Sequence, residues 1–390
     1  MQLFDAFDYF GQRSRDLVEK ILVARRGEQT FKSFDRTWSR LAAIHLLGCQ
    51  PETFDQTRRA LHIEPVRVGT RLEYTWSSIQ AIRRQISPPR QSAALPIIGV
   101  MSGKGGCSKT TFSVLLAQRL VLDGNRVLVI DTDPQANATS LLLAVNPDVC
   151  FEADDTVAPF MMRRELSFHQ RIVQTGMEGL DLVPCCQGAS IMDLEGIKTQ
   201  GESNIDVVNK FWSFRNEIIR LKDRYDVVII DTPPTLTYTN IRSAIASNLL
   251  ITPLAPSMNY ICSSTGFENT MRDYLRDLLG IKNSMPQDIH ARRFMVSQYE
   301  HNKTSHREHA KLIKTIYPGT YDAPFANLTE ISNAGKNGNT VYDERSAINS
   351  SSTRKRALDQ LDVLFSEVIA DIEAISNPQT TVETREVAHG

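Results

Sequence analysis

Six runs of consecutive apolar residues follow one another between residue 95 and residue 299, and segments with helical spacing lie between them. Apolar runs of this length are typical of strands that are buried on both faces of a parallel sheet. Their alternation with helices favours a doubly wound fold. The pattern therefore predicts an α/β domain with a mostly parallel sheet, whose strands lie within residues 95–101, 125–131, 180–184, 225–231, 249–256 and 294–299.

The first 30 residues carry a narrow apolar stripe flanked by charged residues. Apolar side chains recur at steps of four and three residues, as in an amphipathic helix, although Gly11 weakens its middle. Such a helix either pairs with a second chain or packs on its own domain, and both interpretations stay open. We assign residues 1–30 to an N-terminal dimerisation helix, with a stripe formed by Leu3, Phe7, Phe10, Leu17 and Ile21.

Residues 31–90 have the pattern of a small winged helix-turn-helix domain. Two short helices are predicted at 38–48 and 51–62, and the alternating stretch 65–75 predicts a hairpin. A third helix is predicted at 76–86. A helix pair followed by a hairpin is the order of a winged domain, although any short pair of helices can produce such a pattern.

This part of the chain also carries a local basic excess. Residues 11–90 contain 15 Lys and Arg against 8 Asp and Glu, whereas the whole chain has a net charge of −1. Basic excess on a helix pair and hairpin favours contact with DNA phosphates. The candidate DNA-binding residues of this domain are Gln56, Thr57, Arg58, Arg59, Arg67 and Arg71.

Composition sets the remaining limits. At 390 residues and 41% apolar content, the chain is long enough for two or three domains with a real core. Six scattered cysteines without a C-x-x-C pair, and the lack of a signal peptide or an 18-residue apolar run, favour a cytoplasmic protein without a membrane span. Adjacent prolines predict a linker at 87–92, so we expect the main domain at 91–376 and a disordered tail at 377–390.

The chemistry centres on a glycine-rich loop between the first apolar run and a helix. Residues 97–111 read I-I-G-V-M-S-G-K-G-G-C-S-K-T-T. Backbone N–H groups of such a loop, together with the positive end of a helix dipole, bind phosphate. We expect Lys109 at the β- and γ-phosphates and the Thr110 hydroxyl at Mg²⁺. The predicted nucleotide-binding run is Gly103, Lys104, Gly105, Gly106, Cys107, Ser108, Lys109, Thr110 and Thr111.

The loop departs from the strict Walker A pattern, because Ser108 stands where the pattern has its second glycine. An additional lysine, Lys104, follows Gly103 directly. The simpler alternative is a glycine-rich loop with solvated lysines. The strand before the loop and the helix after it favour a phosphate-binding loop.

Two apolar runs end in aspartates. The run 125–131 delivers Asp131 and Asp133 near its carboxyl end, and the run 225–231 ends at Asp231 in a Walker B arrangement. Ligands of open α/β sheets bind at the carboxyl ends of the strands, so we expect Asp231 to hold Mg²⁺ or its water. A single aspartate at a strand end is more often a helix cap, but two such ends beside one phosphate loop favour function.

The segments S-G-K-G-G-C-S-K-T-T, V-L-V-I-D-T-D-P-Q and Y-D-V-V-I-I-D-T-P-P together resemble the deviant Walker A family of ParA-type partition ATPases. The N-terminal helix and winged domain resemble the larger plasmid and phage form. The resemblance implies that Lys104 reaches the partner's nucleotide across a homodimer and that Asp133 positions the attacking water. Asp231 is then linked to Mg²⁺, and Asp131 contacts Lys104 or the metal shell.

The same resemblance implies a biological role. Proteins of this family sandwich ATP in a dimer, bind nonspecific DNA over the nucleoid, and hydrolyse ATP to ADP when a ParB-type centromere-binding partner stimulates them. The larger form also represses its own operon by binding a specific operator. We therefore expect a cytoplasmic, nucleoid-associated ATPase without a membrane partner.

The C-terminal part supplies candidates for nonspecific DNA contact. Residues 333–340 are expected to form a loop, and an amphipathic helix is predicted at 357–372. Cationic side chains near these segments would contact phosphates in a salt-dependent way, although a charge run is usually only a solvated face. The candidates are Lys336, Arg345, Arg354, Lys355 and Arg356.

Three other classes of protein compete with this interpretation. A MinD-like positioning ATPase would end in a basic amphipathic helix, whereas this chain ends T-V-E-T-R-E-V-A-H-G. An electron carrier like the nitrogenase iron protein would need cysteines at a shared cluster, and the cysteines here do not match such positions. The third is a DNA-binding repressor that uses nucleotide only as a switch ligand. Such a repressor would not hydrolyse the nucleotide, whereas a partition ATPase would.

Overall fold

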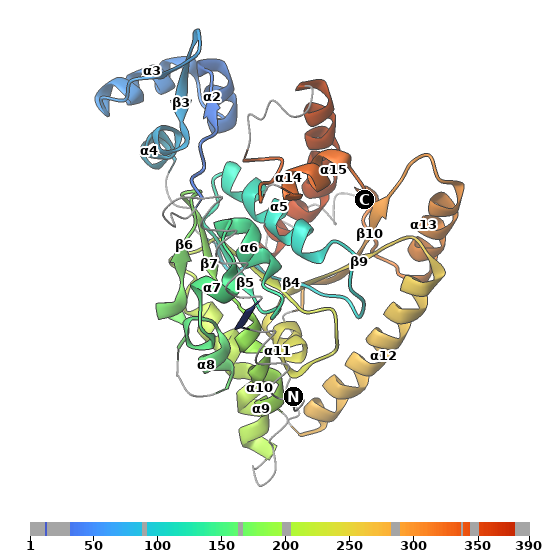
Figure 1. Ribbon diagram of the computed structural model, residues 1–390. Helices are drawn as coiled ribbons and strands as arrows, with labels where there is room; N and C mark the ends of the chain where they lie inside the picture. The colour runs from blue at the N-terminus through green and yellow to red at the C-terminus, as the bar shows by residue number, and fades with distance from the viewer. Residues whose placement is uncertain are drawn as a thin grey trace, which may run out of the picture.

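The computed structural model describes residues 12–13, 32–87, 92–162, 167–196, 204–281, 289–336, 338–343 and 351–378. The described strands form two sheets (Figure 1). One has three strands in the order β1-β3-β2, and the other has eight in the order β11-β10-β9-β4-β8-β5-β7-β6. The predicted helix at 1–30, most of the predicted linker and nearly all of the predicted tail lie outside the described residues.

The small sheet belongs to the N-terminal unit, which is drawn in blue in Figure 1. Its hairpin is antiparallel, and Val68 pairs with Arg71 at the turn. Ser39 caps the first helix by accepting from the Ala42 N–H, and Gly48 ends that helix in a left-handed conformation. The predicted order of two helices, a hairpin and a third helix is present as β1 (Thr37–Trp38), α2 (Arg40–Leu47), α3 (Pro51–Ala60), β2 (Val66–Val68), β3 (Arg71–Thr75) and α4 (Trp76–Ile86).

The large sheet confirms the predicted mostly parallel α/β fold. Every strand pair in it is parallel except the pair of β6 and β7 at one edge. All six predicted strands are present among its members, which are β4 (Ile97–Val100), β5 (Val127–Asp131), β6 (Val173–Gln174), β7 (Leu180–Val183), β8 (Val227–Asp231), β9 (Leu249–Leu254), β10 (Ala291–Tyr299) and β11 (Phe325–Ala326).

Helices cover both faces of this sheet (Figure 1). Alternate residues of the central strands enter two different cores, as Val129 and Ile130 of β5 do. The first core includes α5 and α15, and the second includes α8 and α10. The helices of this domain are α5 (Lys109–Leu122), α6 (Asn137–Leu143), α7 (Pro147–Cys150), α8 (Ala158–Met161), α9 (Ile191–Gly196), α10 (Asn204–Ile219), α11 (Tyr238–Ala246), α12 (Met258–Ile281), α13 (Thr304–Ile316), α14 (Thr329–Lys336) and α15 (Ser351–Ser376).

Two sequence-based expectations near the C-terminus need correction. A loop is expected over residues 333–340, but α14 extends to Lys336. Ile331 on this helix packs against the first core, and that burial outweighs the weak helix propensity of the Asn and Gly residues. The long C-terminal helix α15 also begins at Ser351 rather than near residue 357, so the basic residues at 354–356 lie on a helix.

The N-terminal unit and the large α/β domain share one core. Trp38, Ile79 and Val121 belong to the same buried cluster. The indole of Trp76 donates to the Glu178 carbonyl at 2.9 Å, and Arg83 on α4 donates to the Leu122 carbonyl at 2.7 Å. The two units are therefore packed against each other, and residues 90 and 91, where the division is predicted, lie outside the described residues.

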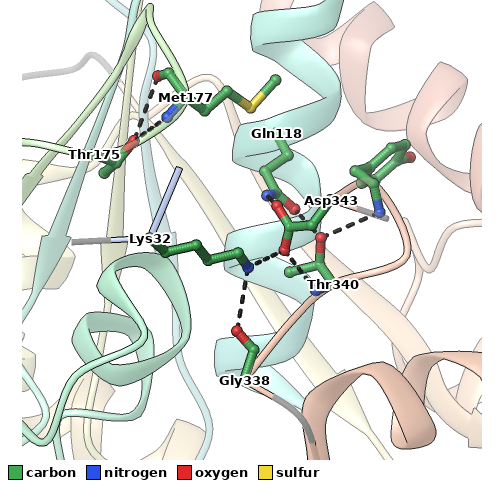
Figure 2. A network of polar contacts seen from close by, with 8 residues as sticks. Lys32, Gln118, Thr175, Met177, Gly338, Thr340 and Asp343 are labelled. Carbon is green, nitrogen blue, oxygen red and sulfur yellow. Dashed lines mark hydrogen bonds and ion pairs between the residues drawn. The ribbon is translucent and has the colours of Figure 1, made fainter. Parts of the chain in front are cut away.

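A polar network continues this junction (Figure 2). Lys32 forms an ion pair with Asp343 and donates to the Gly338 carbonyl at 3.2 Å. The Gln118 amide on α5 donates to Asp343 at 2.9 Å, and Thr340 donates to Gln118 at 2.7 Å. The network thus connects the segment before β1 with α5 and with the segment after α14.

Candidate active site

The loop between β4 and α5 has an internal hydrogen bond, in which the Ser102 hydroxyl donates to the Lys104 carbonyl at 2.8 Å. A Cβ atom at Gly103 would lie 2.7 Å from the Cβ of Phe267, so the close approach of α12 requires glycine there. Ser108 has φ of 67° and directly precedes α5. This left-handed conformation explains why the strict pattern has glycine at this place, and Ser108 adopts it with backbone strain.

Lys109 directly follows this loop. Its side chain is buried and donates from Nζ to the Ser102 hydroxyl at 3.3 Å. It stands at the first position of α5, where the free backbone N–H groups and the dipole favour an anion. A buried ammonium with one neutral hydroxyl partner is well suited to a phosphate group.

Thr110 and Asp231 lie in direct contact. The Thr110 hydroxyl donates to Asp231 Oδ2 at 2.7 Å, and the Ser113 hydroxyl donates to Asp231 Oδ1 at 2.9 Å. Val100 pairs with Asp231 in the sheet, so the end of β8 lies beside the start of the loop. Sequence reasoning missed Ser113. Its position one helical turn after Thr110 puts the two side chains on the same face of α5, and this spacing could have identified it.

Burial raises the pKa of the Asp231 carboxyl to about 6. The hydrogen bonds from Thr110 and Ser113 and the charge of Lys109 favour the charged form and limit this shift. Hydroxyl and carboxylate oxygens are the ligands that Mg²⁺ prefers, so the pair fits this ion. In the described ranges, no cluster of three or more His, Cys, Asp or Glu side chains could hold a metal ion. A Mg²⁺ ion here would depend on the nucleotide phosphates for further ligands.

Asp131 lies at the same sheet edge but has a structural partner. It pairs with Asp231 in the ladder, and its Oδ2 accepts from the Thr139 N–H at 2.9 Å and the Thr139 hydroxyl at 2.8 Å. It therefore caps the first turn of α6 and does not contact Lys104. Burial and the nearby charge of Asp231 raise the pKa of the Asp131 carboxyl to about 8.

Asp133 follows Asp131 by two residues, and its charge acts on both Asp131 and Asp231. It is 6% exposed, and its Oδ1 accepts from the Gln135 N–H at 3.0 Å. Its Oδ2 is not used in this turn, and the residue stands beside both strand ends. This geometry is compatible with the predicted contact to a water molecule.

Two residues that the sequence analysis did not select, Tyr260 and Gln298, donate hydrogen bonds to backbone carbonyls of the loop. The Tyr260 hydroxyl on α12 donates to the Gly105 carbonyl at 3.0 Å, and the Lys104 ammonium lies 4.5 Å from the centre of the Tyr260 ring. The Gln298 amide at the end of β10 donates to the Gly106 carbonyl. Gln298 itself has φ of 50°, which is a strained conformation for a residue other than glycine.

A cavity of about 270 Å³ lies beside the loop. Its lining includes polar residues, and Leu115, Leu141 and Phe325 supply apolar surface. Such a mixed lining suits a flat heterocycle with polar edges. The lining residues that come from the loop, the start of α5, the end of β10 and the chain beyond it include Ser108, Thr111, Gln298, Asn327, Ile331, Asn339 and Thr340.

The candidate DNA-binding residues of the N-terminal unit differ in exposure. Gln56 and Arg59 on α3 are exposed, as are Arg67 and Arg71 on the hairpin, and Thr57 is half-buried. Arg58 is half-buried and forms an ion pair with Asp55 at 3.3 Å, so its charge is already engaged within the unit.

The C-terminal candidates are only partly described. Lys355 and Arg356 are exposed on α15, and Arg354 is half-buried and donates to the Val341 carbonyl at 3.0 Å. The side chain of Lys336 and the whole of Arg345 lie outside the described residues. Of the predicted cluster, Lys355 and Arg356 are therefore exposed to solvent on one helix.

A parallel strand, a glycine-containing loop, a helix that starts with Lys-Thr and an adjacent strand-end aspartate define the class of P-loop nucleoside triphosphatases. The family model described as an AAA domain matches residues 95–274. The SopA protein of Escherichia coli K12 is 27% identical over 290 residues, which cover 71% of this chain and 74% of SopA. A Sinorhizobium fredii protein named as a replication protein A is 27% identical over 86% of this chain and 83% of its own length.

Solved structures show the same fold. A structure named as a partition protein has a TM-score of 0.58 at 20% identity and covers 93% of this chain and 99% of its own. A complex of a Cyanothece McdA variant with ATP has a TM-score of 0.53 at 17% identity over 69% of this chain and 96% of its own. The chain is a homologue of the ParA/Soj/SopA-type partition ATPases and contains an AAA domain of the ParA/MinD-like ATPase kind. No helix of the described residues is long and apolar enough to cross a membrane.

Proposed function

We propose that this chain is an ATP-dependent DNA partition protein that binds ATP and Mg²⁺ at the loop 103–111, forms a homodimer around the nucleotide, and hydrolyses ATP to ADP. The observation that carries the proposal is the hydrogen bond between Thr110 and Asp231 beside the buried Lys109. The Walker A hydroxyl and the Walker B carboxylate are thereby in contact where one Mg²⁺ would need both.

The nucleotide would lie across the loop and the cavity. Its phosphates would accept from the loop N–H groups and from Lys109, and its base would occupy the cavity bordered by Ser108 and Gln298. The solved complex of the McdA variant with ATP supports ATP as the nucleotide, since it has the same fold. Thr110 and Asp231 would hold Mg²⁺, directly or through water, and the ion would neutralise charge that develops on the transferred phosphoryl group.

Asp133 is proposed to position the attacking water, because it is a nearly buried carboxylate at the same sheet edge with an oxygen available to accept. Lys104 is proposed to reach the partner subunit's nucleotide in the dimer. A positive group at that place would stabilise the charge of the transition state. The loop itself contains no arginine that could do so.

The DNA-related functions are proposed from two exposed basic surfaces. An operator would be contacted by Gln56 and Arg59 on α3 and by Arg67 and Arg71 on the hairpin. Through this contact the protein would repress transcription of its own operon. Lys355 and Arg356 on α15 would contact nonspecific nucleoid DNA in a salt-dependent way. The similarity to SopA supports a ParB-type partner that stimulates turnover.

The test is the affinity for ATP of the wild type and of Lys109→Ala, measured by calorimetry with Mg²⁺, together with release of phosphate in the presence of DNA. We expect saturable binding and slow turnover in the wild type and loss of both in the variant. Equal affinity of the two proteins would contradict the assignment of the loop.

A repressor that uses nucleotide only as a switch ligand is the second candidate. One observation favours it: Thr340 lines the cavity and bonds Gln118, which bonds Asp343, the ion-pair partner of Lys32 at the entrance to the N-terminal unit. An occupant of the cavity could therefore affect that unit. Binding of ATP without any turnover, even with DNA and a centromere-binding partner present, would select this candidate.

A further inference from the structure

The two lysines of the phosphate loop lie on different sides of it. The Lys109 ammonium is buried against the Ser102 hydroxyl. The Lys104 ammonium instead lies over the ring of Tyr260, at 4.5 Å from the ring centre, and among the described residues no carboxylate pairs with it. Lys104 is therefore held by a neighbouring helix of its own subunit.

The hydroxyl of the same tyrosine fixes the loop backbone. Tyr260 donates to the Gly105 carbonyl at 3.0 Å, and Gln298 donates to the Gly106 carbonyl. In a trans peptide the carbonyl of one residue and the N–H of the next point in opposite directions. Donors that hold these two carbonyls outward therefore direct the N–H groups of Gly106 and Cys107 to the other side of the loop, where an anion would bind.

We propose that Tyr260 is a positioning residue of the phosphate loop: its hydroxyl orients the Gly105–Gly106 peptide for phosphate, and its ring retains Lys104 away from the phosphates until the nucleotide-bound dimer forms. This inference rests on the proposed ATPase function. The two parts of the side chain make two separable contributions, because the hydroxyl acts on affinity and the ring acts on the availability of Lys104.

Two substitutions separate these contributions. Tyr260→Phe removes the hydroxyl and keeps the ring, so we expect ATP to bind about two- to tenfold more weakly with kcat unchanged. Tyr260→Leu removes both, so we expect the same loss of affinity and a basal kcat that rises about two- to fivefold, the range of an exposed cation–π contact. Tyr274 lies on the same helix and is exposed, so Tyr274→Phe and Tyr274→Leu are matched controls that should change neither parameter.

A second measurement does not depend on turnover. In the protein without added nucleotide, the rate of acetylation of the Lys104 amine is followed by mass spectrometry, with the exposed Lys355 as the internal reference. We expect Lys104 to react faster in Tyr260→Leu than in the wild type and at the wild-type rate in Tyr260→Phe. The tyrosine lies at the surface of α12 and is only half-buried, so both variants should keep the wild-type melting temperature.

The outcomes are distinct. A higher kcat and faster labelling in Tyr260→Leu alone support the proposal. Equal kcat and equal labelling in the two variants, in an active wild type, overturn it and leave the proposed ATPase function intact. Wild-type ATP affinity in Tyr260→Phe overturns the role of the hydroxyl. A wild type that neither binds nor hydrolyses ATP overturns this proposal together with the proposed function.

Discussion

The Thr110 hydroxyl donates to Asp231 Oδ2 at 2.7 Å, although 121 positions of sequence separate the two residues. The contact follows from the sheet, because β4 and β8 are parallel neighbours and the loop leaves β4 at the level where β8 ends. Both side chains offer oxygen to a hard cation at the place where phosphates would lie.

Replacement of Thr110 should therefore affect the metal-dependent part of nucleotide binding. We expect Thr110→Ala to reduce the gain in ATP affinity that Mg²⁺ provides by about tenfold or more, the usual cost of disturbing a metal site. Thr110→Ser keeps the hydroxyl and serves as the control. Titrations with Mg²⁺ and with EDTA measure the difference, and an unchanged Mg²⁺ effect in Thr110→Ala would contradict the role of this residue.

Asp133 should affect turnover without affecting binding. We expect Asp133→Asn to bind ATP like the wild type and to hydrolyse it about a hundredfold more slowly, since positioning of the attacking group contributes about that much. The variant should then accumulate as an ATP-bound dimer. Phosphate release and light scattering measure the two effects, and normal hydrolysis would remove Asp133 from the mechanism.

The pair of buried aspartates should make the protein without nucleotide less stable at high pH. The pKa of Asp131 is about 8 in the folded chain against 3.8 for a free side chain, so the folded state binds this proton more tightly than the unfolded state. The resulting stabilisation is complete below about pH 4 and is lost as the pH rises toward about 8. The raised pKa of Asp231 adds a stabilisation of the same kind, which is lost as the pH rises toward about 6.

Urea unfolding in EDTA at several pH values between about 5 and 9 tests this prediction. We expect the midpoint of the wild type to fall with rising pH and the midpoint of Asp131→Asn to fall less. A wild-type midpoint that rises across this range, or the same slope in both proteins, would contradict the pKa of Asp131.

Helix α3 is the candidate for the helix that contacts DNA. On this helix Arg59 tests DNA contact better than Arg58, because Arg58 forms an ion pair with Asp55. We expect Arg59→Ala to weaken operator binding with little change in ATP hydrolysis and, for a phosphate contact, to lower the slope of log affinity against log salt by about 1. Lys311→Ala, at an exposed position of α13, is the control. Unchanged operator affinity in gel-shift or anisotropy titrations would exclude α3 as the helix that contacts the operator.

The main fold could be predicted from local patterns, and so could the part of the site that the phosphate loop and the strand ends form. Apolar runs ending in Asp131 and Asp231 identify strand ends without any tertiary information, and Lys109 follows from its place at a helix start. Tyr260 and Gln298 could not be predicted, because they reach the loop from 155 and 192 residues away through the order of β4, β9 and β10 in the sheet. The extent of α14 was missed for a related reason, since burial of Ile331 against the first core is a tertiary effect.

The most direct test of the account is sedimentation velocity of the wild-type protein without nucleotide, with ADP, and with Mg²⁺ and a non-hydrolysable ATP analogue. The account predicts that the triphosphate analogue increases the dimer fraction beyond that seen with ADP and that Lys109→Ala shows no such increase. A sedimentation coefficient that is the same in all three conditions would contradict the claim that ATP bound at this loop joins two copies of the chain.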